Sequence, residues 1–245
     1  MRGPRTSGYE PSAVHRGPHP GIVALVFTSL FLAGLVPVTM LGGDTHFPSP
    51  LQPPEEVVSY FRTEPGRVRL CAFLQFASSI PLGIFTATMV SRLRFLGVTV
   101  AGPSIAQFGG LAASSAVAGS SLVQWVLAQP GIADDIALTR ALHFLTFAVG
   151  GPGYSVPLGL LIAGLSVPSF FFRLLPRWLC LYGLVLSLVG ELSTLSLAIP
   201  GALFLIPLTR FPGFLWLIFA GFMLPHSPPG DSRHPESSST GQFKE

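Results

Sequence analysis

Long apolar stretches recur along the chain, and they constrain its fold more than any other feature. The first, GIVALVFTSLFLAGLVPVTML at 21–41, contains no charged residue. A helix of about 20 apolar residues is long enough to cross a hydrocarbon core about 30 Å thick. Only 10% of the 245 residues are charged, and the mean hydropathy is +0.59, whereas soluble domains carry about 25% charged residues. The chain is therefore expected to be an integral membrane protein.

The spacing of these stretches predicts an all-α fold, a polytopic transmembrane helical bundle of about six spans with kinked helices. The expected spans are 21–41, 68–90, 103–128, 139–165, 178–198 and 203–224. The first run is too long for a signal-peptide core of about 7–15 residues, so we interpret it as an uncleaved span. Residues 1–20 and 226–245 are polar and rich in Gly, Pro and Ser, which predicts disordered tails.

Arginine and lysine predict the orientation of the bundle. The short loops SRLRFLG (91–97) and FFRLLPRW (171–178) are basic, whereas QPGIADDIAL (129–138) is acidic. Because basic loops stay inside, both termini are expected to be cytoplasmic, although three arginines in RTEPGRVR (62–69) argue against it. The arginines do not form one clustered basic face, so the expected partner is the lipid bilayer and not nucleic acid.

The segment PPEEVVSYFRTEPG (53–66) has the pattern of a short helix between the first two spans. Prolines open it, acidic residues fill its first turn, and Pro-Gly ends it. Val57, Val58 and Phe61 would share one face. The favoured interpretation is an interfacial helix that rests on the bilayer or on the bundle. The alternative is a lid over an outer cavity.

The third span contains GGLAASSAVAGSS (109–121), in which small residues recur at four-residue spacing. This pattern predicts close helix packing, either within the bundle or with a membrane-protein partner or a second copy of the chain. Ser120 and Ser121 lie at a depth similar to that of His143, which leaves a rhomboid-like hydrolase as an alternative. However, G-x-S-x-G is absent, and helical serines often donate to their own backbone.

Glu191 is the only acidic residue deep inside an expected span. An intramembrane carboxylate is costly and is expected to have a partner or a proton. The helix rise places both Glu191 and Arg210 about 10 Å below the outer ends of their spans. The short turn AIPGA (198–202) makes these spans neighbours. The pair either fixes the register of a hairpin or serves a proton or substrate site, provided that the side chains face each other.

Further polar side chains fall at similar outer depths in the other spans. They are His143, Gln75, Gln124 and Arg140. Together with Glu191 and Arg210 they predict a polar pocket open to the outside. In it Glu191 accepts protons, Arg210 either holds Glu191 charged or binds an anion, and His143 titrates near neutral pH. The alternative for His143 is an interfacial histidine with satisfied hydrogen bonds.

The segment GGPGYSVPLG (150–159) interrupts the fourth span. Its special residues are Gly150, Gly151, Pro152, Gly153 and Pro157. Residues 139–165 suffice for one crossing and are too few for two. Because each proline removes a backbone donor, the segment predicts either a kinked helix or a true break that lines a cavity. Such breaks build transporter sites, although the chain shows no inverted repeat.

No cofactor is expected from the remaining patterns. Cys71 and Cys180 fall near opposite membrane faces, which argues against a disulfide, and no metal-ligand cysteine spacing is present. There is no G-x-x-x-x-G-K-[ST] nucleotide motif. His143 is the only histidine inside an expected span, so bis-histidine haem ligation is not available there.

Four blocks of the sequence resemble bacterial multi-pass membrane proteins of uncharacterised families, the domains of unknown function. They are RVRLCAFLQFASSIPLGIFTATMVSRLRFLG, GGPGYSVPLGLLIAG, LPRWL and GELSTLSL. The resemblance covers most of residues 20–225 and implies a helical bundle in a bacterial inner membrane. It implies no activity and no catalytic residues. The leading functional hypothesis is a small transporter or ligand-binding membrane protein with an outward-facing polar cluster. The alternatives are a structural or accessory protein and an intramembrane enzyme.

Overall fold

The computed structural model describes residues 17–40 and 47–227, and in these ranges all regular structure is helical. The α-helices are α1 (Pro20–Thr39), α2 (Pro54–Thr63), α3 (Pro65–Phe95), α4 (Gly102–Leu127), α5 (Ile136–Gly150), α6 (Pro152–Phe171), α7 (Arg177–Leu192) and α8 (Leu205–Met223). Short 3-10 helices are η1 (Ile132–Asp134), η2 (Ser193–Leu197) and η3 (Pro200–Phe204). Apart from their inner edges, the expected tails 1–20 and 226–245 lie outside the described residues.

Six stretches of helix are long and apolar enough to cross a membrane. They are α1, α3, α4, α5 with α6, α7 with η2, and η3 with α8. This finding confirms the expected all-α bundle, and the chain is a multi-pass membrane protein.

Prolines explain why several of these helices begin where they do. Pro20, Pro54, Pro65 and Pro152 each stand in the first turn of a helix. The fixed φ of proline suits that turn, and its missing N–H removes no hydrogen bond there. The starts of these helices are therefore determined by local sequence.

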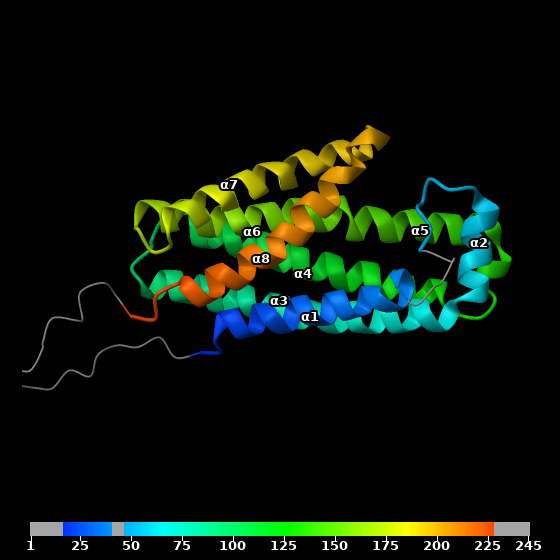
Figure 1. The fold of residues 1–245 in the computed structure, drawn as a ribbon, viewed down its shortest axis with the longest axis horizontal. Helices are drawn as coiled ribbons and strands as arrows, with labels where there is room; N and C mark the ends of the chain where they lie inside the picture. The colour runs from blue at the N-terminus through cyan, green and yellow to red at the C-terminus, as the bar shows by residue number, and fades with distance from the viewer. Residues whose placement is uncertain (1–16, 41–46, 228–245) are drawn as a thin grey trace, which may run out of the picture.

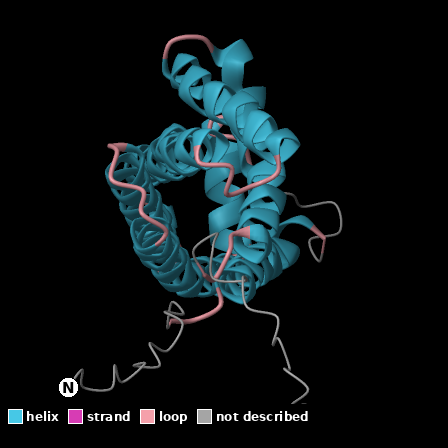
Figure 2. Ribbon diagram, turned by 90° about the vertical axis from the view of Figure 1, so that its left-hand side faces the viewer, coloured by secondary structure: helices cyan, strands magenta, loops and turns pink. Residues whose placement is uncertain are grey.

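The two ends of the bundle differ (Figure 1). The start of α1 and the end of α8 lie together at one end, which we call the terminal end. The short helix α2 lies across the opposite end, which we call the α2 end. The helix α8 runs diagonally over the other helices, and α7 packs on α6 and α8 at the edge of the bundle, which is seen from the terminal end in Figure 2.

Close packing inside the bundle uses the small residues of α4. A Cβ added at Gly109 would lie 2.5 Å from the backbone nitrogen of Leu161 in α6. A Cβ at the adjacent Gly110 would lie 2.2 Å from the Thr86 hydroxyl oxygen in α3. The small residues therefore let α4 approach two neighbours of the same chain, as the four-residue spacing predicts.

The helix α2 rests on the end of the bundle with the face predicted from its sequence. Val57, Val58 and Phe61 are all buried, and so is Tyr60. Arg62 ties the helix to η1, because it donates to the carbonyl oxygen of Ala133 at 2.9 Å and lies 3.5 Å from an Asp134 carboxylate oxygen. The helix is thus a cover held by an apolar face and by polar contacts at its edge.

Candidate functional site

A cavity of about 290 Å³ lies in the half of the bundle nearest to α2, although no residue of α2 lines it. Its walls come from α1, α3, α4, α5 and α8, and Phe47, Pro48 and Pro50 of the segment before α2 close one side. The cavity brings together Gln75, Gln124, His143 and Arg210, four of the polar residues that the sequence places at similar depth. Glu191 and Arg140 do not line it.

Arg210 reaches the cavity from α8. Its guanidinium donates a hydrogen bond to the carbonyl oxygen of Gly150. The guanidinium carbon lies 5.4 Å from the ring centre of Phe31 and 5.2 Å from that of Tyr154, distances at which a cation is attracted to an aromatic ring. No carboxylate in the described ranges forms an ion pair with Arg210. Within the described residues, its positive charge is therefore balanced only by two ring faces and one carbonyl oxygen.

Glu191 does not meet Arg210, although α7 and α8 are neighbours. Its side chain is exposed on the edge of the bundle, where Oε1 lies 3.4 Å from the place of a Cβ on Gly159 in α6. The helix rise fixes depth but not rotation about the helix axis. The cavity is therefore lined by α1, which contributes Phe31, where α7 with Glu191 was expected from the sequence.

The fourth span is divided at Gly151. Helix α5 ends at Gly150 and α6 begins at Pro152, and Gly151 between them has ψ −101°, outside the helical range. A residue before proline is sterically disfavoured from the helical conformation, which accounts for the position of the break. Gly150 and Gly151 both line the cavity, and the carbonyl of Gly150 accepts from Arg210. Gly153 and Pro157 lie within α6.

His143 sits between the cavity and the cover. Only 2% of its surface is exposed, and its ring lies 5.7 Å from that of Phe47 and 5.2 Å from that of Phe61. Aromatic side chains of α2 and of the segment before it therefore pack directly on a polar residue of the cavity wall. A displacement of α2 would uncover this histidine.

Several side chains of the cavity wall carry buried polar atoms that have no hydrogen-bond partner in the described part of the chain. They are Gln124 Oε1, His143 Nδ1, Thr146 Oγ1 and Arg210 Nε. Leaving one such group unpaired costs about 1–3 kcal/mol. Most buried polar atoms in proteins are paired, so several unpaired ones around one cavity indicate a site for a polar ligand or for water.

Thr146 and Tyr154 were not among the residues expected from the sequence. Thr146 lies three residues after His143 on α5, so helical periodicity would have placed both on one face. Tyr154 is fully buried, and its hydroxyl has no hydrogen-bond partner among residues 17–40 and 47–227. It lies beyond the break at Gly151, and no pattern in the sequence shows that it packs against Arg210.

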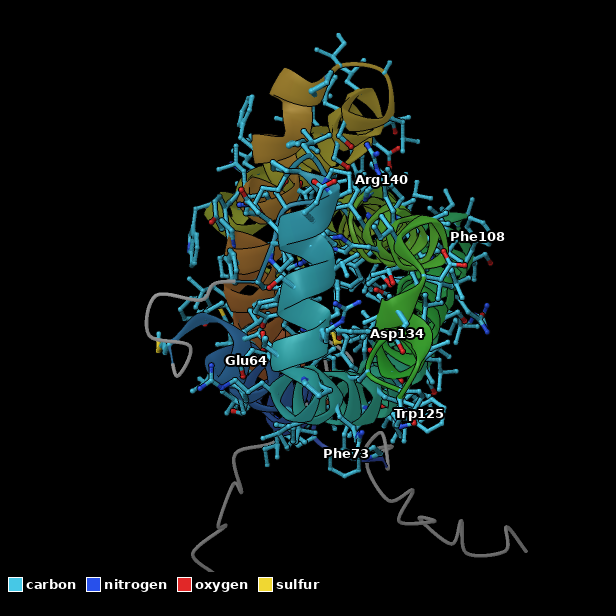
Figure 3. The ribbon with its side chains drawn as sticks, turned by 90° about the vertical axis from the view of Figure 1, so that its right-hand side faces the viewer. Glu64, Phe73, Phe108, Trp125, Asp134 and Arg140 are labelled. Atoms are coloured by element: carbon cyan, nitrogen blue, oxygen red, sulfur yellow. The ribbon has the colours of Figure 1, made fainter. Side chains whose placement is uncertain are left out.

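The two serines considered as nucleophiles donate to backbone carbonyls. Ser120 donates to Thr146 at 3.0 Å, and Ser121 donates to Val117 at 2.7 Å. Arg140, which is labelled in Figure 3, is not among the residues that line the cavity. Its guanidinium carbon lies 5.6 Å from the ring centre of Phe144. In the described structure, neither Ser120 nor Ser121 forms a hydrogen bond with His143.

Cys71 and Cys180 are free and buried. Among residues 17–40 and 47–227, no three or more His, Cys, Asp or Glu side chains are grouped to hold a metal ion.

No family model matches the chain, and no curated protein or solved structure matches it either. Its function must therefore be inferred from the cavity itself.

Proposed function

We propose that the chain binds a small organic anion in the cavity at the α2 end, as the substrate site of a transporter. The observation that carries this proposal is the charge of Arg210, which lines the cavity without a carboxylate partner in the described ranges. An anionic group would supply the missing counter-ion. The apolar wall, which includes Phe31, Val117 and Ile206, suits an apolar body attached to that group.

The division of the fourth span supports a transporter in particular. Irregular backbone within a membrane is tolerated where it lines a cavity, and discontinuous helices commonly form substrate sites in transporters. Gly150 and Gly151 stand at such a division and line the cavity. The accessory hypothesis has less support, because Gly109 and Gly110 already pack against α6 and α3 of the same chain.

The arginine distribution supports an orientation in which the cavity opens to the outside. Arg92, Arg94, Arg173 and Arg177 belong to the loops at the terminal end or to the adjoining helix ends. Because basic short loops stay in the cytoplasm, we place the terminal end inside and the α2 end outside.

Thermal unfolding in detergent with a graded series of carboxylates, from acetate to benzoate and phenylacetate, tests the site. Benzyl alcohol and benzylamine are the uncharged and cationic controls. Ligand at 100 times its dissociation constant stabilises the folded state by about 2.7 kcal/mol, so carboxylates that fit should raise the midpoint. Arg210→Gln should abolish this effect, whereas Arg140→Gln, which removes an arginine outside the cavity, should retain it. Equal stabilisation of wild type and Arg210→Gln would contradict the proposal.

A second variant separates a binding role from a structural one. The Gln124 side chain is 5% exposed, and its Oε1 has no hydrogen-bond partner in the described structure. Replacing it by leucine removes this unpaired oxygen and also the hydrogen bond between the Gln124 and Cys71 side chains, so Gln124→Leu should unfold near the wild-type temperature without ligand. Its response to carboxylates should be weaker. Uptake of a binding carboxylate into vesicles then distinguishes a transporter from a receptor.

A further inference from the structure

A second hollow lies outside the bundle and is independent of the proposed anion cavity. It is a groove of about 670 Å³ between α3 and α4, near the α2 end. Phe73 and Phe76 line it from α3, and Leu122 and Trp125 line it from α4. Phe73 and Trp125 lie on the same outer side of the bundle in Figure 3.

This groove lies on the outer surface of the bundle, where membrane lipid would contact it. Phe73 is 64% exposed and Trp125 is 48% exposed, on two helices that are long and apolar enough to cross a membrane. Trp125 stands in the last turn of α4, a position typical of tryptophans at the boundary between hydrocarbon and headgroups. From Arg69 to Phe76 the groove runs along α3 for about 10 Å, given the rise of an α-helix. Its length and composition suit part of an acyl chain.

Arg69 places a positive charge at the groove. Two nearby arginines have carboxylate partners, because Arg67 lies 3.2 Å from Glu64 and Arg62 lies 3.5 Å from Asp134. Arg69 lines the groove and donates to the carbonyl of Ala128 at 3.2 Å. It forms no ion pair with a carboxylate of the described chain. A guanidinium has five N–H donors, so others are left for an anion.

We propose that this groove binds a phospholipid with an anionic headgroup. The lipid phosphate lies on Arg69, and one acyl chain runs along Phe73 and Phe76. A lipid fits better than a partner helix, because the groove combines an apolar channel with one uncompensated cation at the depth of an interfacial tryptophan. A zwitterionic lipid carries its own ammonium group, which lessens its attraction to Arg69.

Quenching of Trp125 by brominated lipids tests the proposal. The chain has three tryptophans, of which Trp216 is fully buried, so Trp178→Phe leaves Trp125 as the lipid-accessible fluorophore. The protein is reconstituted in phosphatidylcholine vesicles with increasing brominated phosphatidylglycerol or brominated phosphatidylcholine. We expect half-maximal quenching at about fivefold lower mole fraction of the anionic lipid, the effect of one basic side chain at an anionic surface. Trp125→Phe should remove the signal.

Charge variants decide between specific and general attraction. Arg69→Gln should bring the two quenching curves together, whereas Arg62→Gln, which removes the same charge from a paired arginine nearby, should leave them apart. Arg69→Lys keeps the charge and should keep the preference. Equal quenching by both lipids in the protein with native Arg69 would overturn the proposal. So would an equal effect of Arg69→Gln and Arg62→Gln, or a persistent preference in Arg69→Gln.

Discussion

Arg210 donates its hydrogen bond to the carbonyl oxygen of Gly150, the last residue of α5 before the fourth span divides. A side chain of the sixth span thus forms a hydrogen bond to the backbone at the point where the helix of the fourth span is interrupted. The break at Gly151 and the charge of Arg210 form one unit at the wall of the cavity, and Glu191 takes no part in it.

A double-mutant cycle at Arg210 and Glu191 should show little coupling. Arg210→Gln should lower the free energy of unfolding by about 1–3 kcal/mol, because it removes a buried hydrogen bond to Gly150. Glu191→Gln should change it by the same amount in wild type and in Arg210→Gln, since no hydrogen bond or ion pair joins the two side chains in the described structure. Denaturation in detergent measures both variants and the double mutant. A coupling energy well above about 0.5 kcal/mol would show that the side chains interact after all.

Two glycines of α4 should respond in opposite ways to the same substitution. Gly109→Ala places a Cβ 2.5 Å from the backbone nitrogen of Leu161, so α4 and α6 must separate. We expect a loss of about 1–3 kcal/mol of stability. Gly119→Ala meets its nearest atom, in Val149, at 3.7 Å and should stabilise the helix by up to about 1 kcal/mol. If both variants unfold alike, the packing of α4 on α6 is not as described.

Labelling of Cys71 should report the opening of the α2 cover. This thiol is 1% exposed and lines the cavity together with Phe47, whose ring lies 5.9 Å from that of Phe61 on α2. In a Cys180→Ser background, Phe61→Ala should raise the labelling rate at least about tenfold, because the lost packing lowers the free energy of local opening. Phe108→Ala, at a side chain 67% exposed, is the matched control. Fast labelling already in the parent protein would mean that α2 is no cover.

The side from which Cys71 is labelled tests the proposed orientation. A membrane-impermeant maleimide added outside intact cells should react with Cys71 of Phe61→Ala without permeabilisation. Labelling that requires permeabilised cells would place the α2 end in the cytoplasm, against the arginine distribution.

Tyr60 on α2 should ionise late. Burial, aided by the nearby Cys71 and Glu64, raises the pKa of Tyr60 to about 12, from an ordinary value of 10.0. Between about pH 10 and 12, Tyr60 stays protonated while α2 is packed on the bundle and ionises when α2 is displaced. The stability of the packed state relative to the displaced state should therefore fall as pH rises through this range. The tyrosinate absorbance of wild type minus Tyr60→Phe should give a midpoint near the raised pKa. A midpoint near 10 would show that Tyr60 is accessible to solvent.

The fold class followed from the sequence because its causes are local. A run of apolar residues long enough for the membrane must be helical there, since no water is present to satisfy an open backbone. The first-turn prolines of α2, α3 and α6 mark helix starts by the same local logic. Depth along a span is estimated from the same local pattern, which groups Glu191 and Arg140 with the four polar residues that line the cavity.

Only the tertiary structure decided which of these residues share a cavity. Rotation about a helix axis depends on packing against neighbours, and strongly apolar spans leave it undetermined, because their hydrophobic pattern marks no face. Glu191 and Arg210 matched in depth, yet α7 lies at the edge of the bundle while α8 turns Arg210 toward Gly150. Phe31 and Tyr154, which flank the guanidinium, come from helices far apart in the chain. The sequence by itself determined how many spans there are, and the packing of the helices determined which polar groups meet.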